Sequence, residues 1–203
     1  VMKKLYAYTL LLSLLTVLNS NIKAQVSSDF ADNNCIKKDN IIIDAFYGWP
    51  YFNGTILRSL SNANNLSNVK NTNHLGARFE FMIDKKIGLG GEFTYANAGV
   101  NYQSGATGNW EKAGVSKIRI LGRFNYHFGT TEKVDPYFAL GAGYKRTTYY
   151  DSGASNLNQT INLVPVSFKL ALGMRVFFDD LIGLNAEIGI GGPLISAGFT
   201  LKL

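Results

Sequence analysis

The feature that most constrains the fold of this chain is the alternation of apolar and polar residues that dominates beyond about residue 40. Between Lys117 and Phe128 the sequence reads KIRILGRFNYHF, with apolar or small residues at even positions and mostly polar residues at odd positions. A β-strand sends alternate side chains to opposite faces, whereas a helix would mix the two sets around its circumference. The same split recurs over residues 75–83 and 164–178, so the sequence predicts an all-β fold.

Eight strands are expected, connected in chain order as an antiparallel up-and-down sheet. They cover residues 40–49, 73–83, 87–102, 115–128, 136–149, 163–178, 183–190 and 194–203. Several of them exceed the ~5–6 residues usual in globular proteins and reach the ~9–11 residues that a tilted strand needs to cross a bilayer.

The predicted connections differ in length at the two ends of the strands. Short turns are expected at residues 84–86, 129–135 and 179–182, long polar loops at residues 50–72, 103–114 and 150–162, and a short connection on the loop side at 191–193. Short turns at one end and long loops at the other are typical of transmembrane β-barrels. The expected fold is therefore an eight-stranded antiparallel up-and-down transmembrane β-barrel.

A soluble lipocalin-like barrel is the alternative, because it also has eight strands but turns its apolar face inward. Aromatic residues instead cluster near the strand ends, as the two interfacial girdles of a membrane barrel require. They are Tyr47, Trp49, Tyr51, Phe52, Tyr95, Tyr102, Tyr144, Tyr149 and Tyr150 toward the loops, and Phe128, Tyr137, Phe138, Phe177 and Phe178 toward the turns. Gly and Ala between the charges of the polar face suit a crowded lumen, and the first strand lacks the lipocalin Gly-x-Trp pattern. We therefore expect the polar face to point inward.

The polar face places eleven charged residues in the lumen. They are Asp44, Arg78, Glu80, Glu92, Arg119, Arg123, Lys145, Lys169, Arg175, Glu187 and Lys202. An eight-stranded barrel is only wide enough for side chains, and charges inside it must pair or stay hydrated. This favours an ion-paired plug over a selective pore. Tight pairing across residues 84–86 would set Arg78 opposite Glu92, whereas Arg175 faces either Glu187 or a residue two positions away.

The segment SAGFTLKL at residues 196–203 is expected to be the strand that closes the ring, since an open edge in lipid leaves costly unpaired backbone groups. It also resembles the recognition signal of bacterial outer-membrane barrels at Ser196, Gly198, Leu201 and Leu203, although that family usually ends in Phe. The chain from about Asn40 resembles the small eight-stranded barrels of the OmpA/OmpX-like superfamily. Lys-Ala-Gln at 23–25 and Tyr-Gly-Trp-Pro at 47–50 resemble the "porin family" or outer membrane beta-barrel proteins of Bacteroidetes.

The first residues resemble a secretory signal peptide, with Lys3 and Lys4 before an apolar run at residues 5–18. We expect a signal peptide at 1–24, a periplasmic segment at 25–39 and the barrel at 40–203. Removing the leader would lower the formal charge of +6 by three, and so mild a charge does not indicate nucleic-acid binding. Cys35 is the single cysteine of the sequence, so no intrachain disulfide is expected.

Little in the sequence indicates catalysis. Some barrels that are similar in outline modify lipid A with His/Ser/Glu or His/Asp/Ser sites, but the two histidines here form no such motif. His127 falls beside a turn, at the wrong end, and His74 has only Ser67 and Thr72 nearby in sequence. A nucleophile needs a base within hydrogen-bond reach. The expected protein is not an enzyme, and no metal or cofactor is predicted, since no His/Cys cluster occurs.

The sequence thus predicts an integral protein of the bacterial outer membrane with a structural or surface-interaction role. A narrow passive pore for small solutes and a lipid A-modifying enzyme are the alternatives. The expected partners are outer-membrane lipid, the barrel-assembly machinery and an extracellular partner at the three long loops. Within these loops, Tyr51, Phe52, Trp110 and Tyr150 are the candidate contact residues.

Overall fold

The computed structural model describes residues 34–50, 70–103, 108–152, 158–160 and 165–203, all within one compact unit, Asn33–Leu203. The predicted leader at 1–24 and the loop residues Tyr51 and Phe52 lie outside these ranges. Among the residues described, no helix is long and apolar enough to cross a membrane.

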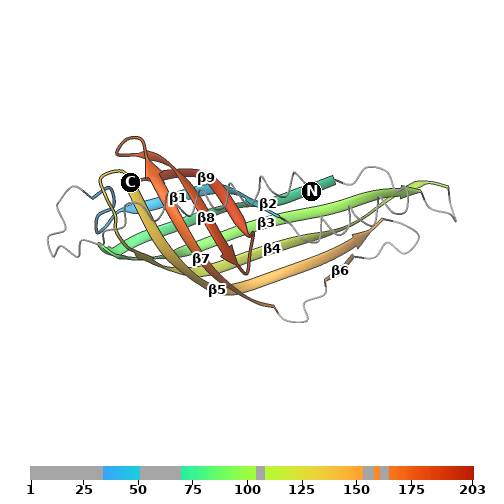
Figure 1. Ribbon diagram of the computed structural model, residues 1–203. Coiled ribbons are helices and arrows are strands. Elements are labelled where there is room, and N and C mark those ends of the chain that lie inside the picture. The colour runs from blue at the N-terminus through green and yellow to red at the C-terminus, as the bar shows by residue number, and fades with distance from the viewer. Residues whose placement is uncertain (1–33, 51–69, 104–107, 153–157, 161–164) are drawn as a thin grey trace, which may run out of the picture. The chain divides into compact units, whose positions relative to one another are not determined.

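In the described ranges, nine strands form a single antiparallel sheet (Figure 1). They are β1 (Ile41–Trp49), β2 (Lys70–Asp84), β3 (Ile87–Gln103), β4 (Trp110–His127), β5 (Val134–Asp151), β6 (Asn158–Thr160), β7 (Val166–Phe177), β8 (Ile182–Ile190) and β9 (Ile195–Lys202). Each strand pairs with its neighbour in the chain, except that β5 pairs with β6 at one end and with β7 along the rest. The three-residue β6 lies outside the ring, so the barrel has eight strands, as predicted.

The ring closes between the first strand and the last. β1 pairs with β9 from Ile42 opposite Lys202 to Trp49 opposite Ile195. Beyond this ladder, Ile41 and Leu203 exchange two backbone hydrogen bonds of 2.8 and 2.9 Å. The prediction that residues 196–203 close the barrel is confirmed, and these strands leave no open edge at the seam.

The alternation read from the sequence separates the interior of the barrel from its exterior. Along β8 buried and exposed residues alternate from Ile182 to Glu187, and along β4 they do so from Ile118 to His127. Phe79, Ile120 and Leu172 are among the many large apolar residues that are at least half exposed on the outer face. Charged residues occupy the inner face. This arrangement is the inverse of a soluble barrel, as the sequence predicted.

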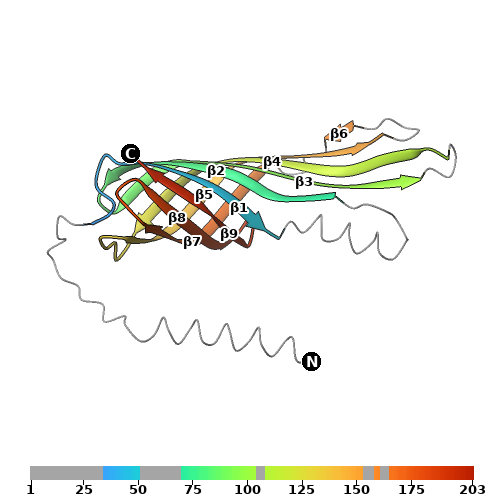
Figure 2. The same ribbon diagram turned by 90° about the horizontal axis from the view of Figure 1, so that it is seen from above.

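The strands differ widely in length. β3, β4 and β5 have 17, 18 and 18 residues, whereas β8 and β9 have nine and eight. Figures 1 and 2 show β3, β4 and β5 running well past the ends of β7, β8 and β9 on the loop side. Within the expected loop at 103–114, Gln103 and residues 110–114 therefore continue the β3–β4 hairpin. The alternation weakens there, because a sheet that rises beyond the barrel needs no apolar outer face.

The opposite end of the barrel is closed by short turns and by the chain that precedes β1. In one turn, Asp179 Oδ1 accepts hydrogen bonds from the backbone N–H groups of Ile182 and Leu181, at 2.7 and 2.8 Å. These hydrogen bonds lower the pKa of Asp179. Residues 34–40 fold over the same end, and we call this segment the cap. Cys35 and Ile36 are buried there against Ile42, Met82 and Phe177.

Candidate functional site

The interior of the barrel is filled by buried charged side chains, which form two clusters. The turn-end cluster consists of Asp44 on β1, Glu80 on β2, His127 on β4, Asp135 on β5 and Arg175 on β7. The loop-end cluster consists of Arg78 on β2, Glu92 on β3, Arg119 and Arg123 on β4, Lys169 on β7 and Glu187 on β8. Every one of these residues is at most 5 % exposed.

Arg175 is the centre of the turn-end cluster. Its Nη2 lies 3.0 Å from Asp44 Oδ2 and 2.7 Å from Glu80 Oε2, and its Nη1 lies 3.4 Å from Asp135 Oδ2. A single guanidinium thus joins carboxylates from three strands across the lumen. Its planar set of donors suits such multiple contacts. The guanidinium also stacks over the Tyr137 ring, with its carbon 4.4 Å from the ring centroid.

His127 joins two of the same carboxylates. Its Nδ1 lies 2.8 Å from Asp135 Oδ1, and its Nε2 lies 2.8 Å from Glu80 Oε1. A neutral imidazole carries one N–H donor, whereas an imidazolium carries two. Because both ring nitrogens face carboxylate oxygens, the geometry fits the cationic form. His127 therefore supplies positive charge to a cluster that otherwise has three acids and one arginine.

The loop-end cluster is built around two glutamates. Lys169 Nζ lies 2.6 Å from Glu92 Oε2 and 2.7 Å from Glu187 Oε2, so it bridges them. Arg123 also contacts both carboxylates. Arg78 lies 3.2 Å from Glu92 and 2.9 Å from Glu187, measured from its Nε and Nη2. Arg119 Nη2 lies 2.9 Å from Glu92 Oε1. Four basic residues therefore surround two acidic ones.

The two clusters join into one network. Arg78 Nη1 lies 3.9 Å from Asp44 Oδ2, and Tyr137 donates a 2.9 Å hydrogen bond to Glu187. Thr200 on β9 donates to Asp44 at 2.6 Å, which brings in the last barrel strand. All eight barrel strands thus contribute a side chain. Buried ions are tolerated only when they are paired and hydrogen-bonded. Each ion of this network has an oppositely charged partner, although Arg119 Nε and Arg123 Nε make no hydrogen bond.

Nine of the eleven residues expected in the lumen belong to this network. Lys145 is half-buried above the loop-end cluster, and Lys202 donates a 2.6 Å hydrogen bond to the backbone oxygen of Cys35 in the cap. Both lie outside the network because they stand where the inward face reaches a mouth of the barrel. The network residues that the sequence reasoning missed are His127, Asp135, Tyr137, Asn185 and Thr200. His127 was on the predicted inward face, which was the available signal.

The strand register decides the expected pairings. Arg78 stands opposite Glu92, as expected from the turn at residues 84–86. Arg175 stands opposite Asn185, and Glu187 stands opposite Gly173. The β7–β8 hairpin therefore has the register that is shifted by two residues from an Arg175–Glu187 pairing. The four residues that resemble an assembly signal lie on β9 or just after it. Ser196 is buried and accepts a 2.7 Å hydrogen bond from Arg78, whereas Leu203 is 59 % exposed.

Comparison with protein families identifies the barrel. Residues 44–195 match the family model described as "Outer membrane protein beta-barrel domain", which covers most of the chain. The chain belongs to this family. It is a β-barrel protein of the bacterial outer membrane. No curated protein matches the sequence.

Solved structures with a similar fold include other outer-membrane barrels. OprG of Pseudomonas aeruginosa matches with a TM-score of 0.50 and 15% identity, over 82% of this chain and 97% of that one. The N-terminal barrel domain of Pseudomonas aeruginosa OprF has a TM-score of 0.47 and 13% identity, over 83% and 100%. Ail of Yersinia pestis has a TM-score of 0.44 and 13% identity, over 82% and 96%. At these identities, the likeness to OprG shows the fold alone.

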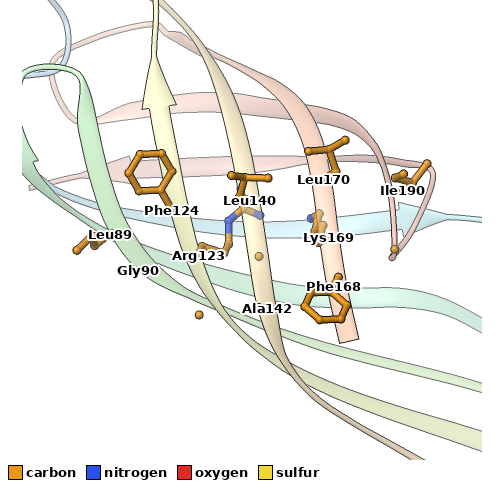
Figure 3. Close-up of a pocket in the computed structure, with 13 residues that line it drawn as sticks. Leu89, Gly90, Arg123, Phe124, Leu140, Ala142, Phe168, Lys169, Leu170 and Ile190 are labelled. Carbon is orange, nitrogen blue, oxygen red and sulfur yellow. The ribbon is translucent and has the colours of Figure 1, made fainter. Parts of the chain in front are cut away.

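In an outer-membrane barrel the apolar outer face contacts lipid. A hollow of about 900 Å³ interrupts this face between β3, β4, β5 and β7 (Figure 3). Its rim includes Leu89, Phe124, Leu140 and Phe168, while Gly122 contributes no side chain. All four rim residues are at least 37 % exposed on the outer face. Its lining also includes Arg123 and Lys169 of the loop-end cluster, so the hollow adjoins the charged network.

The residues considered for catalysis lie apart from the lipid face of the outer-membrane barrel. His74 is 6 % exposed on the inward face of β2, opposite Gly48. Ser67 lies outside the described residues, and so does the side chain of Thr72. His127 is enclosed by Glu80 and Asp135 near the turns. Within the described ranges, no group of three or more His, Cys, Asp or Glu residues is arranged to hold a metal ion.

Proposed function

We propose that the protein is a non-conducting, non-enzymatic platform in the outer membrane. Its charged network plugs the lumen, and its β3–β4–β5 sheet and long loops contact partners outside the cell. The carrying observation is the network itself, in which eleven buried ionisable residues from seven strands bridge the lumen, with Thr200 of the eighth hydrogen-bonded to Asp44. An eight-stranded barrel has room only for its own side chains, and here those side chains are bound to one another.

The part of the sheet beyond the barrel supports the surface role. Trp110 begins β4 at this end and is 64 % exposed, and Tyr149 on β5 is 45 % exposed. Tyr150 is partly buried and donates a 3.1 Å hydrogen bond to Asn97, which braces the sheet. Short turns of outer-membrane barrels face the periplasm and long loops face outward. Exposed aromatic residues on a rigid sheet outside the cell are well placed to contact another molecule.

Assembly into the membrane is the second part of the proposal. β9 carries Ser196, Gly198 and Leu201, and Leu203 follows it, at the spacing of the barrel-assembly signal. A Cβ atom at Gly198 would lie 1.9 Å from the backbone oxygen of Ala45 across the seam. The glycine therefore permits close pairing of β9 with β1. We infer that the barrel-assembly machinery receives the chain through this strand.

Single-channel recording tests the plug. The protein is folded in detergent, its folded state is checked by the difference in gel mobility between boiled and unboiled samples, and it is placed in a planar bilayer. We expect heat-modifiable mobility and no steady conductance. A steady conductance that scales with salt concentration would overturn the plug and make the lumen charges the lining of a pore. A Glu92→Ala/Glu187→Ala variant serves as the positive control for conductance, because it removes both carboxylates that hold the basic residues of the loop-end cluster together.

A further inference from the structure

Three basic residues meet at the mouth of the barrel: Arg119 of the loop-end cluster and two lysines beyond it. Arg119 on β4 stands opposite Lys145 on β5 in the strand register. Lys117 lies two residues further along β4 and therefore on the same face. Lys117 is close enough to Arg119 and Lys145 for their charges to act on it. Like charges on directly opposite residues destabilise a sheet, so this grouping needs an explanation.

The side chains of Lys117 and Lys145 have no acidic partner within 4 Å in the described part of the chain. Arg119 differs from them, because it contacts Glu92 and donates to the backbone oxygen of Gly191. It therefore forms a fixed floor beneath the two lysines. Both lysines are partly exposed, as a site open to solvent at a barrel mouth requires.

The rest of the loop side offers little negative charge. No Asp or Glu occurs at residues 50–69, 103–109 or 152–165, so these loop segments supply no carboxylate. Glu111 and Asp151 are the acids at this end, and each is six residues along its strand from Lys117 or Lys145. At ~3.3 Å per residue this separation is about 20 Å. Across the strand pair, Asp151 stands opposite Ala113, four residues or ~13 Å along β4 from Lys117. Asp151 also accepts a 2.8 Å hydrogen bond from Tyr102.

The plug below cannot neutralise the mouth either. Its loop-end cluster holds four basic residues around Glu92 and Glu187, whose carboxylates are already shared among them. Positive charge therefore accumulates from the plug up to the mouth. Such a site attracts an anion with several oxygen acceptors, since charge-assisted hydrogen bonds from ammonium and guanidinium groups are strongest to these.

We propose that the loop-end mouth is a binding site for a multivalent phosphate-bearing anion, held by Lys117 and Lys145 above the guanidinium of Arg119. The three side chains belong to the inward face, so the anion reaches them through the aqueous mouth. This proposal goes beyond the platform role, because it requires neither a partner at the loops nor a conducting lumen. The phosphate can belong to a soluble molecule or to a lipid headgroup at the rim.

Calorimetric titration with inorganic pyrophosphate tests the site. The full chain, folded in an uncharged detergent at low salt, is compared with Lys117→Gln/Lys145→Gln and with the control Lys85→Gln/Lys133→Gln. The control pair is exposed at the turn end and removes the same charge. We expect saturable binding that the mouth variant weakens about tenfold or more and the control leaves within about twofold. The Lys117→Arg/Lys145→Arg variant should retain binding.

Two results would overturn the proposal: no saturable heat from the unsubstituted protein at millimolar pyrophosphate, or equal weakening in the control pair. Gel mobility before and after boiling verifies that each variant is folded. The titration is then repeated in nanodiscs of neutral lipid and of lipid containing phosphatidylglycerol. Loss of pyrophosphate binding only with the anionic lipid would assign the site to a headgroup phosphate. Binding in both membranes would assign it to a soluble anion.

Discussion

The two ends of the barrel interior solve the problem of buried charge in opposite ways. The turn-end cluster has three carboxylates, one arginine and a histidine held between two of the acids. The loop-end cluster has four basic residues and two glutamates. The first is closed by the cap, whereas the second continues into an open mouth with two more lysines. Neither cluster has equal numbers of positive and negative charges, and the contact of Arg78 with Asp44 links the two clusters.

This difference indicates that the contribution of a buried charged residue to stability depends on whether its cluster has an excess of acids or of bases. Removing one partner of a buried ion pair destabilises a protein because it leaves the other charge uncompensated. In the turn-end cluster, bases are scarce, and in the loop-end cluster acids are scarce. The same type of substitution should therefore have different effects in the two halves.

The largest contrast is expected for the basic residues. Arg175→Met leaves Asp44, Glu80 and Asp135 with His127 and the 3.9 Å contact of Arg78 to Asp44, and should lower the unfolding free energy by about 3–5 kcal/mol. Lys169→Met leaves three arginines around two glutamates, and should cost about 1 kcal/mol. Denaturant unfolding in lipid vesicles, followed by gel mobility, measures both. Equal losses of stability in the two variants would contradict the idea that the two clusters differ in their need for basic residues.

For the acidic residues, we expect the opposite order, with the larger loss of stability in the loop-end cluster and a smaller difference between the two clusters. Glu187→Gln leaves four bases with one carboxylate, and we expect a loss of about 3 kcal/mol. Asp135→Asn leaves His127 and Arg175 with two carboxylates, a balanced set, and should change stability by less than about 1 kcal/mol. The same unfolding assay applies. A larger effect of Asp135→Asn than of Glu187→Gln would show that local surplus is not the deciding factor.

The cap gives the turn end a pH dependence in the alkaline range. Burial, followed by the charge of Asp135, raises the pKa of Cys35 from 9.0 to about 11. The docked cap favours the neutral thiol, so its stabilisation is complete below about pH 9 and is lost as the pH rises through about 11. The protection factors of residues 34–40, which correct for base-catalysed intrinsic exchange, should fall over this range. The Cys35→Ala variant should lose this fall in protection, and the same fall in that variant would rule out the thiol.

The smallest expected effect is spectroscopic, and it separates the two ends by their surroundings. Trp49 and Trp110 are the two tryptophans of the sequence, and both are more than half exposed. Trp49 ends β1 among interfacial residues, whereas Trp110 lies on the sheet beyond the barrel. In single-tryptophan variants, acrylamide should quench Trp110 more strongly and brominated lipid should quench Trp49 more strongly. Lipid quenching of Trp110 would mean that the tall sheet lies on the membrane surface.

The sequence was sufficient to predict the fold because one local pattern carries it. Alternation placed Ile120 outside and Arg119 inside without knowledge of any other strand. It was less useful beyond the membrane, where β4 begins at Trp110 rather than at the expected residue 115. There the outer face meets water, so the pattern has no physical cause to persist.

The partners inside the lumen were harder to predict, for a geometric reason. Arg175 on β7 and Asp44 on β1 meet across the barrel, and β8 and β9 lie between them in the wall. Such contacts depend on strand tilt and stagger around the whole ring, which no single strand reveals. Arg78 and Glu92 were predictable because a tight turn joins their strands. His127 was considered only as a candidate for catalysis. Its position between Glu80 and Asp135 was not predicted, because these acids lie on two other strands.

The seam between β1 and β9 makes completion of the ring depend on the two strands most remote in the chain. Ile42 and Lys202 are partners across it, so local contacts alone cannot form the ladder. A product that stops before β9 would present two open edges to lipid, where each unpaired backbone group costs several kcal/mol. Ring closure therefore requires β9, and a polypeptide truncated before this strand cannot seal the barrel.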